Sequence, residues 1–256
     1  MTAEALAARA KVLGCPVDRL SFKETSDFCR ETIDSGKFAR QVSVNAAKLV
    51  AMRKNERLRT AVISSDIISA DGQAIVWASR LLGDRLPGRV NGTDLMWELI
   101  HVAERHGYGI YVLGATKEVL TQAVQNLEEQ FPNLKIAGYH DGYFSDDELP
   151  AIVESIRAAA PQILFLAISS PKKEYFLHDH FDKLGVPFAM GVGGSIDIVA
   201  GITKRAPRWM HSAGLEWLYR VIQEPRRMWR RYLVTNAVFL ALLLRAMLAR
   251  AVGLGR

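Results

Sequence analysis

The sequence contains little cysteine, no Asp-x-Asp pair and no long uncharged apolar run. Two of its 256 residues are cysteines, Cys15 and Cys29, and their spacing matches no metal-ligand or redox motif. We therefore expect no disulfide framework and a reducing compartment. The N-terminal residues lack the basic segment and apolar stretch of a secretion signal, so we expect the protein to act inside the cell.

The absence of Asp-x-Asp argues against one kind of metal site. Carboxylates at this spacing commonly hold a divalent ion beneath a nucleotide diphosphate. The cluster His178-Asp179-His180 does not replace such a pair, because residues two apart on a helix point to opposite sides and cannot converge on one ion. We expect no metal site and no cofactor.

Charge is distributed unevenly along the chain. The net charge is +6, yet residues 203–256 contain eleven Lys and Arg against two acids, a local +9 that leaves −3 on residues 1–202. An excess of Lys and Arg is typical of segments that bind nucleic acid, anionic lipid or phosphorylated ligands. Charge alone does not distinguish these three.

Short apolar runs alternate with longer helical patterns over most of residues 1–203. This alternation is typical of βαβ units, so we predict an α/β fold with a Rossmann-like, mostly parallel sheet flanked by helices. The runs lack polar alternation, which favours strands buried on both faces. The predicted strands span residues 41–44, 66–70, 109–113, 134–138, 162–168 and 187–192.

Helix-starting residues lie between these runs. Thr116 can cap a helix that ends before Pro132, and Ser145 with Glu148 has the S-x-x-E pattern of a capping box for a helix that ends before Pro161. In parallel α/β sheets, ligands bind beyond the carboxyl ends of the strands. Residues directly after each strand are therefore the candidates for a site.

The pattern changes in the last part of the chain. We divide the chain into a domain of residues 1–203 and a helical, basic appendage of residues 204–256. The apolar run at 237–244 is followed by Arg245 and Arg250 and is too short to cross a bilayer, which takes about 20 residues. We expect the appendage to dock in the plane of a membrane surface; the alternative is a buried C-terminal helix with a basic end.

Asp71 is the first candidate for chemistry. It ends a predicted strand in Ile68-Ser69-Ala70-Asp71-Gly72, ahead of a helix predicted at 73–82. At the crevice, its carboxylate could accept a proton from a hydroxyl group within hydrogen-bond reach. The alternative is a structural role as the cap of that helix.

Two glycine-containing turns are candidates for phosphate binding. Free glycine amides and helix N-termini suit a diphosphate. Neither turn has the G-x-G-x-x-G or the G-x-x-x-x-G-K-[ST] pattern, so ordinary strand-to-helix connections explain them equally well. The turns are Gly114-Ala115-Thr116 and Gly191-Val192-Gly193-Gly194-Ser195.

Arginine and aromatic residues are interleaved in the appendage. Arg220, Arg227 and Arg231 share one helical face if the helix continues through Pro225. Arg binds phosphate through paired hydrogen bonds, and Trp and Tyr favour the headgroup region, so a lipid diphosphate is a suitable ligand. Stacking on single-stranded nucleic acid is the alternative, but it does not require the following apolar run. The aromatic residues are Trp209, Trp217, Tyr219, Trp229 and Tyr232.

Short motifs follow one another along nearly the whole chain. They are Ala70-Asp71-Gly72, Arg89-Val90-Asn91-Gly92-Thr93-Asp94, Leu113-Gly114-Ala115, Gly142-Tyr143-Phe144, Ser170-Pro171-Lys172-Lys173-Glu174, Gly191-Val192-Gly193-Gly194-Ser195-Ile196-Asp197, Lys204-Arg205-Ala206-Pro207-Arg208-Trp209 and Gly214-Leu215-Glu216-Trp217-Leu218-Tyr219-Arg220. In this order they resemble the WecG/TagA/CpsF family, glycosyltransferase family 26.

The resemblance implies an inverting, metal-independent glycosyltransferase of bacterial exopolysaccharide or cell-surface polysaccharide synthesis. It would move a sugar from a UDP-sugar to a polyprenyl-diphosphate-linked saccharide at the cytoplasmic face of the cell membrane, as a peripheral protein. Residues 1–203 would bind the nucleotide sugar, and residues 204–256 would bind the membrane and the acceptor. No nucleic-acid partner is implied. Similar enzymes often self-associate, but the sequence shows no separate interface.

The resemblance also implies roles for single residues. Asp71 would be the general base that deprotonates the acceptor hydroxyl. The nucleotide-sugar pocket would include Ser43, where threonine is usual, with Asn45, Arg89, Tyr143 and Asp197. The acceptor diphosphate would contact Arg220, Arg227 and Arg230.

Lys173 departs from the family pattern, which commonly reads Pro-Lys-Gln-Glu. An amide accepts and donates hydrogen bonds, whereas an ammonium only donates them. We interpret Lys173 as a substrate-binding residue that could change the donor, so a hexose, an N-acetylhexosamine and a uronic acid all stay open.

On the residues alone, two other classes also stay open. A dinucleotide-dependent oxidoreductase would use the same kind of sheet, but its fingerprint is missing. A non-catalytic module that binds a membrane or nucleic acid would explain the basic tail and nothing else.

Overall fold

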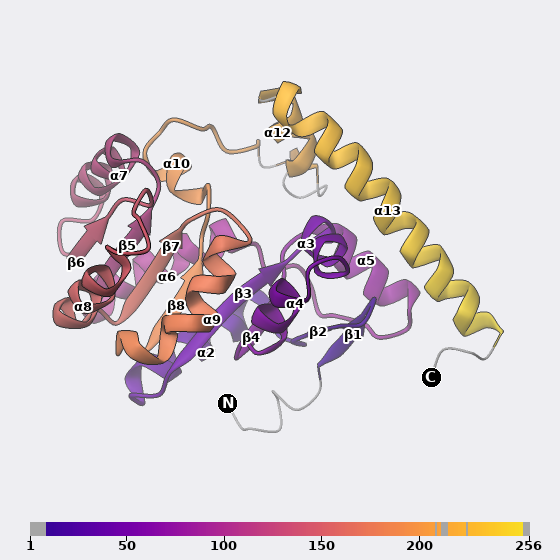
Figure 1. Cartoon of the computed structure of the whole chain (residues 1–256), viewed down its shortest axis with the longest axis horizontal. Coiled ribbons are helices and arrows are strands. Elements are labelled where there is room, and N and C mark those ends of the chain that lie inside the picture. Colours follow the sequence, from indigo (N-terminus) through magenta and orange to yellow (C-terminus); the bar gives the residue numbers. More distant parts are fainter. Residues whose placement is uncertain (1–8, 208, 211–214, 224, 253–256) are drawn as a thin grey trace.

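A computed structural model describes residues 9–207, 209–210, 215–223 and 225–252, without the side chains of residues 220, 226–228 and 230–231. Six parallel strands form one sheet in the order β4-β3-β8-β7-β5-β6 (Figure 1). All six predicted strands are present, which confirms the α/β fold class. They are β3 (Ala39–Val44), β4 (Ile67–Ala70), β5 (Gly109–Gly114), β6 (Lys135–His140), β7 (Ile163–Ala167) and β8 (Phe188–Gly191).

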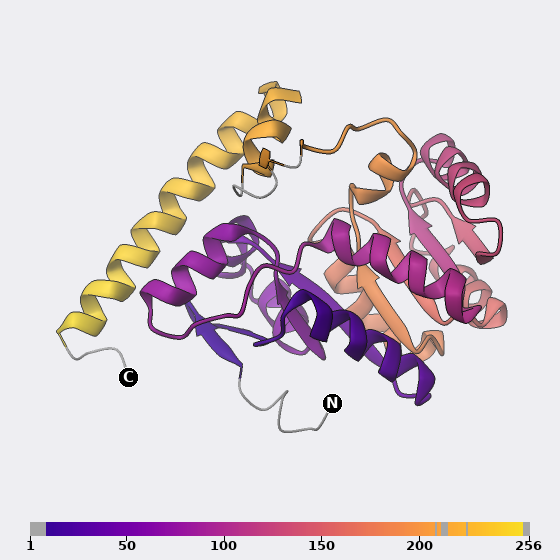
Figure 2. The same ribbon diagram turned by 180° about the vertical axis from the view of Figure 1, so that it is seen from behind.

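Helices cover both faces of this sheet. One face carries α3 (Ala46–Met52), α4 (Glu56–Ile63), α8 (Leu149–Ala159) and α9 (Lys172–Leu184), which lie toward the viewer in Figure 1. The opposite face, seen in Figure 2, carries α2 (Phe22–Asp34), α6 (Gly92–His106), α7 (Lys117–Gln130) and α10 (Ser195–Val199). The inner strands β3, β8, β7 and β5 therefore have apolar neighbours on both faces of the sheet.

The burial of the strands follows their place in the sheet. Every residue of β5 and β7 is buried, as the uninterrupted apolar runs predict. The same prediction is wrong for β6, whose residues alternate between exposed and partly buried. β6 is an edge strand of the sheet, whereas β4, the strand at the other edge, is fully buried because a hairpin packs against it.

A short antiparallel hairpin, not predicted from the sequence, lies beside the other edge. Its strands are β1 (Ala10–Val12) and β2 (Cys15–Val17), and they pack with β4 and α5 (Gln73–Leu81) in one apolar cluster. Cys15 and Cys29 are both buried and unpaired. Burial raises the pKa of the Cys15 thiol to about 12, so this thiol is unreactive at neutral pH.

One of the two predicted helix caps is confirmed. Thr116 accepts a hydrogen bond from the Val119 N–H at 3.4 Å and starts α7. The predicted capping box at Ser145 and Glu148 forms only in part. The Glu148 carboxylate accepts from the Ser145 N–H at 2.7 Å, but the Ser145 hydroxyl also donates to that carboxylate instead of accepting from a helical N–H, and α8 begins only after Glu148. A complete capping box exists at Ser21, which opens α2.

The appendage contains α12 (Glu216–Gln223) and the long helix α13 (Pro225–Ala251), which runs along the outside of the molecule (Figures 1 and 2). Phe239 and Leu243 on α13 are buried in the apolar cluster that includes Leu49 and Met52 of α3. At the far end of α13, the Arg250 guanidinium lies against Gly83. One stripe of α13 is thus packed on the domain.

The opposite stripe of α13 is apolar and exposed. In the segment Tyr232–Ala251, mean hydropathy reaches 1.8 and 11% of the most apolar window is buried, so the alternative of a buried C-terminal helix is wrong. By length and composition this helix could cross a membrane, which corrects the inference drawn from the short apolar run alone. The exposed apolar residues of this stripe include Trp229, Leu233, Leu240, Leu244, Leu248 and Val252.

Candidate functional site

The carboxyl ends of β3 and β8 form a topological switch point, the place where a parallel α/β sheet is expected to have its ligand crevice. These strands are neighbours, but β3 leads into α3 on one face of the sheet and β8 leads toward α10 on the other. Such divergence of two connections leaves the space in which parallel α/β proteins bind ligands. Ser43 and Asn45 lie at the end of β3, and Asp197 lies in α10.

Asp71 lies at the neighbouring strand end, directly after β4. Its backbone N–H donates to the Val44 carbonyl at 2.8 Å, which aligns it with the end of β3. A side-chain carbon placed on Gly72 would lie 3.7 Å from Asn45 Cβ, so the two segments are in contact. The residue that caps α5 is Gly72, with φ at 131° and no side-chain hydrogen bond to the helix. The alternative reading of Asp71 as the helix cap is therefore wrong.

The segment that contains Arg89 joins the same group of residues. The Val90 N–H donates to the Ala70 carbonyl at 2.9 Å and holds this segment beside the end of β4. Asn91 Oδ1 then accepts from two N–H groups in the first turn of α6, at 2.9 and 3.1 Å. Ser43 Oγ faces the start of α6, 3.4 Å from where a side chain on Gly92 would begin. Ser43, Asn45, Asp71 and Arg89 are thus brought together.

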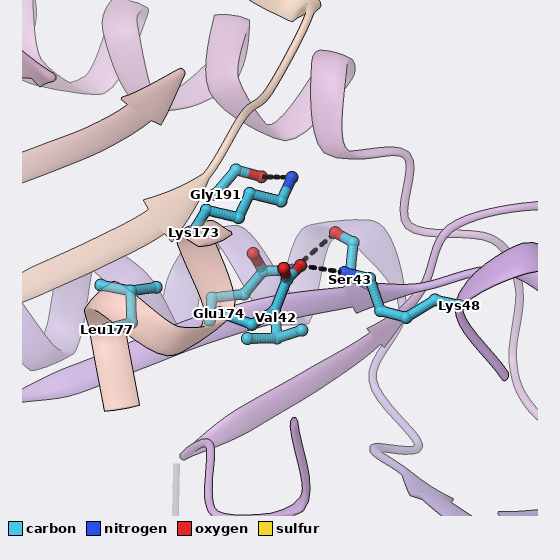
Figure 3. Close-up of a pocket in the computed structure, with 8 residues that line it drawn as sticks. Val42, Ser43, Lys48, Lys173, Glu174, Leu177 and Gly191 are labelled. Atoms are coloured by element: carbon cyan, nitrogen blue, oxygen red, sulfur yellow. Dashed lines mark hydrogen bonds and ion pairs between the residues drawn. The ribbon is translucent and has the colours of Figure 1, made fainter. Parts of the chain in front are cut away.

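Lys173 reaches the crevice from the first turn of α9 (Figure 3). Its ammonium donates to the Gly191 carbonyl at 3.3 Å. Its side chain passes so close to the glycine turn that a Cβ on Gly191 would lie 2.8 Å from Lys173 Cδ. Gly191 therefore gives Lys173 the room to place a cation at the end of β8. On the other side of this turn, Asp197 Oδ2 lies 3.3 Å from where a Cβ on Gly194 would sit.

The other glycine turn has a packing role. A Cβ on Gly114 would lie 2.4 Å from the Ala167 backbone, and one on Gly142 would lie 2.9 Å from Gly114. The backbones of three segments meet there too closely for any side chain. For this turn the ordinary structural explanation holds.

Lys48 and Glu174 form a buried ion pair beside the end of β3, which was not predicted from the sequence. Lys48 Nζ lies 2.6 Å from Glu174 Oε1 and donates to the Ser43 carbonyl, also at 2.6 Å (Figure 3). The side chains of Lys48 and Glu174 are 8% and 1% exposed. The pair links the end of β3 to the start of α9, and so it fixes Ser43 relative to Lys173.

The pKa of Glu174 reflects this setting. Burial acts to raise the pKa, but the positive charges of Lys48 and Lys173 and hydrogen bonds from Lys48 and Ser170 outweigh it, so the pKa lies below its ordinary value. Glu174 is therefore ionised at neutral pH. A buried lysine inside a helix gives no local signal, which is why the pair escapes a reading of the sequence.

Tyr143 lies apart from the other candidates. It follows the edge strand β6, its N–H donates to Asp141 Oδ1 at 2.9 Å, and it is 79% exposed. The order of strands places β6 at the opposite edge of the sheet from β4. The structure thus gathers Ser43, Asn45, Asp71 and Arg89, sets Lys173 and Asp197 at the adjoining turn, and leaves Tyr143 outside this group.

The appendage contacts the site through Glu216, the first residue of α12. Glu216 Oε2 accepts from Asn91 Nδ2 at 2.9 Å and lies 3.7 Å from Arg89 Nη1. Upstream of α12, Arg205 forms an ion pair with Asp94 of α6. Glu216 was not among the predicted site residues, although it is one of only two acids in a strongly basic segment. An isolated acid in a basic segment was the feature of the sequence that could have marked Glu216 as a candidate.

The predicted acceptor-binding arginines lie in this appendage. Arg220 belongs to α12, and Arg227 and Arg230 belong to α13. Their side chains lie outside the described part of the structure.

Among the residues that the structure describes, no three His, Cys, Asp or Glu side chains form a group that could hold a metal ion. His178 Nδ1 lies 3.0 Å from Ser64 Oγ, whereas the neighbouring Asp179 pairs with Arg57 at 2.7 Å. The side chains of this cluster have separate partners.

The parallel α/β sheet defines a Rossmann-like protein, and the carboxylate, amide and hydroxyl groups and two cations near the ends of its strands are groups that suit an anionic ligand. Residues 10–252 match the Glycosyl transferase WecG/TagA/CpsF family. The chain belongs to this family and is a glycosyltransferase, so the interpretations as an oxidoreductase and as a non-catalytic module are wrong.

Two relatives share a name, N-acetylglucosaminyldiphosphoundecaprenol N-acetyl-beta-D-mannosaminyltransferase. The relative from Bacillus subtilis (strain 168) is 38% identical over 191 residues, which cover 75% of this chain and 73% of the relative. The relative from Bacillus spizizenii is 34% identical over 224 residues, covering 85% and 86%. The similarity therefore extends through most of both chains.

Proposed function

We propose that this glycosyltransferase transfers a sugar from a UDP-sugar to a polyprenyl-diphosphate-linked saccharide, with inversion at the anomeric carbon and without a metal ion. The observation that carries the proposal is the position of Asp71, beside Asn45 and Arg89 at the strand-end crevice of a member of this family. The names of the relatives make N-acetylmannosamine the first donor to test and an N-acetylglucosaminyl diphosphate lipid the first acceptor.

The reaction follows from one carboxylate acting on one hydroxyl group. Asp71 accepts the proton of the acceptor hydroxyl as its oxygen attacks the anomeric carbon. The bond between that carbon and the diphosphate oxygen breaks, and UDP leaves with the electron pair. Because the attack comes from the side opposite UDP, a single displacement inverts the configuration.

The cations at the crevice offset the charge of the leaving diphosphate. Arg89 is 13% exposed, so its charge is only partly screened by water. Lys173 adds a second cation at the end of β8. Fixed positive groups that face a developing negative charge lower the barrier without reorganising. They would do here what a divalent ion does in metal-dependent sugar transferases.

The lipid acceptor requires the enzyme to work at a membrane surface, which we place at the cytoplasmic face. The exposed apolar stripe of α13 would enter the lipid headgroup region, and the arginines of the appendage would attract anionic lipid. We favour docking in the plane of the membrane over a spanning helix. Phe239 and Leu243 are buried against the domain, and crossing the bilayer would separate them from it.

A panel of UDP-sugars with a synthetic polyprenyl-diphospho-N-acetylglucosamine tests donor, acceptor and reaction together. Product mass identifies the sugar transferred, and the anomeric configuration tests inversion. Activity that withstands EDTA supports metal independence. The same panel with Lys173→Gln, which restores the residue usual in the family, tests whether Lys173 sets the donor preference. Absence of UDP release with every donor would overturn the proposal.

A further inference from the structure

Two charged contacts fasten the appendage to the start of α6. Arg205 pairs with Asp94, and Glu216 accepts from Asn91 and lies beside Arg89. Asn91 is the N-cap of α6 and Asp94 lies in its first turn, next to the ends of β3 and β4. The helix α12 is therefore held at the mouth of the crevice by groups that also form its wall.

Arg89 would have two partners: Glu216 of the appendage and, in the proposed function, the diphosphate of the donor. With Glu216 Oε2 at 3.7 Å, the guanidinium already faces one carboxylate. A nucleotide diphosphate brought to Arg89 would approach that carboxylate as a second anion. The side chains of Arg89 and Glu216 are 13% and 17% exposed, so water screens the repulsion only in part.

We propose that Glu216 is a positioning residue that couples the donor site to the appendage. While the donor site is empty, the Glu216 carboxylate takes the place of the donor diphosphate beside Arg89 and holds α12 against α6. Donor binding displaces this carboxylate and loosens α12, so that the appendage can admit the lipid-linked acceptor. The inference rests on the proposed function, because it assigns Arg89 to the donor diphosphate.

Linkage between two sites is reciprocal. If donor binding weakens the contact between Glu216 and Arg89, that contact must weaken donor binding by the same factor. Glu216→Gln removes the competing charge but keeps the size of the side chain. UDP should therefore bind this variant about fivefold to tenfold more tightly than the wild type, within the usual range of coupling between sites. Its kcat with the lipid acceptor should stay at or above that of the wild type, because α12 is already released as donor binding would release it. A merely structural role would weaken both properties together.

Hydrogen exchange of the full-length protein follows the contact directly. In the wild type, adding UDP should speed exchange of the amides of residues 215–223. In Glu216→Gln these amides should exchange faster without UDP, and UDP should change them little. Asp94→Asn removes the ion pair between Arg205 and Asp94 and should also speed exchange of these amides without ligand. Glu56→Gln, which breaks the exposed pair between Glu56 and Arg59, is the control and should change nothing.

Unchanged or weaker UDP binding by Glu216→Gln, alongside measurable binding by the wild type, would overturn the coupling and leave the proposed function intact. Protection of residues 215–223 by UDP in the wild type would also overturn it. If the wild type bound no UDP at all, the UDP-sugar donor would be wrong, and the coupling that rests on it would fall as well.

Discussion

At the scale of single residues, the assignment of Asp71 makes a sharp prediction. Asp71→Asn keeps the shape of the side chain but removes its ability to accept a proton. We expect the rate of UDP release with the lipid acceptor to fall by about 100-fold to 10,000-fold, the usual contribution of general acid–base catalysis. The affinity for UDP, measured by calorimetry, should stay within about twofold, because a base for the acceptor contributes little to donor binding.

The matched control for Asp71→Asn is Asp147→Asn. Asp147 is exposed in the loop that follows β6 and lies outside the crevice, so its substitution should leave turnover unchanged. Wild-type turnover by Asp71→Asn would remove Asp71 from the role of base.

The buried pair of Lys48 and Glu174 makes a prediction about stability. Glu174→Gln leaves the Lys48 ammonium buried without its counter-charge, so we expect the free energy of unfolding at pH 7 to fall by about 3–5 kcal/mol. Urea unfolding followed by circular dichroism measures the change. Glu154→Gln, which breaks an exposed pair with Arg157, should cost less than about 1 kcal/mol.

The same pair makes stability depend on pH. The pKa of Glu174 is lowered in the folded protein from the ordinary value of 4.5, so its ionised form stabilises the fold above that pH. This contribution is lost as pH falls through the lowered pKa. The difference in stability between the wild type and Glu174→Gln should therefore shrink at acidic pH. An equal difference at pH 7 and at pH 3 would show that the charge of Glu174 is not the cause.

At the scale of elements, α13 has two apolar stripes with different partners. One stripe packs on α3 through Phe239 and Leu243, and the other is exposed. We expect Leu240→Glu with Leu248→Glu to weaken cosedimentation with anionic liposomes at least tenfold, because transfer of a leucine side chain from water is worth about 1.5–3 kcal/mol when burial is complete. The melting temperature should change little, since both residues face solvent.

Phe38→Glu is the control for this experiment. Phe38 is 58% exposed, close to the 56% of Leu240, and lies just before β3, at the end of the strand opposite the crevice. It should leave liposome binding unchanged. Binding through the exposed stripe should also persist at high salt, whereas binding by arginine alone should fall steeply. Full binding by the doubly substituted helix would show that another surface docks.

At the scale of the whole molecule, the appendage both docks the enzyme and completes its acceptor site in our proposal. Removal of residues 204–256 should therefore abolish transfer to the lipid acceptor and binding to liposomes. Calorimetric titration with UDP provides the folding control, because the gathered donor-site residues all precede residue 204. Full activity of the truncated protein on a short-chain acceptor would reduce the appendage to an anchor.

Truncation has a second expected consequence. It uncovers the part of the apolar cluster on α3 that Phe239 and Leu243 cover. The shortened protein should accordingly be less soluble than the whole chain, which size-exclusion chromatography would detect as aggregation. Aggregated protein cannot serve in the activity comparison, so the UDP titration must precede it.

The sequence by itself determined the sheet and the place of its catalytic candidate. Strands such as β5 and β7 are buried on both faces, and that burial leaves uninterrupted apolar runs that can be read directly. Asp71 could be placed at the crevice because a carboxylate at the end of such a run lies at the ligand-binding edge of any parallel sheet. The signal at Thr116 is local as well, since the capping hydroxyl and the Val119 N–H that donates to it are only three residues apart.

Only the tertiary structure decided which of these local features meet. Asn91 and Glu216 are 125 residues apart in the chain, and no local pattern links them or Lys48 and Glu174. The order of strands also separated Tyr143 from the other candidates and exposed β6 as an edge. Periodicity and capping act within a few residues, whereas these contacts depend on which strands pair and which helices pack. Strands, helix caps and candidate residues can therefore be predicted from the sequence, whereas the contacts that bring these residues into one site depend on the fold.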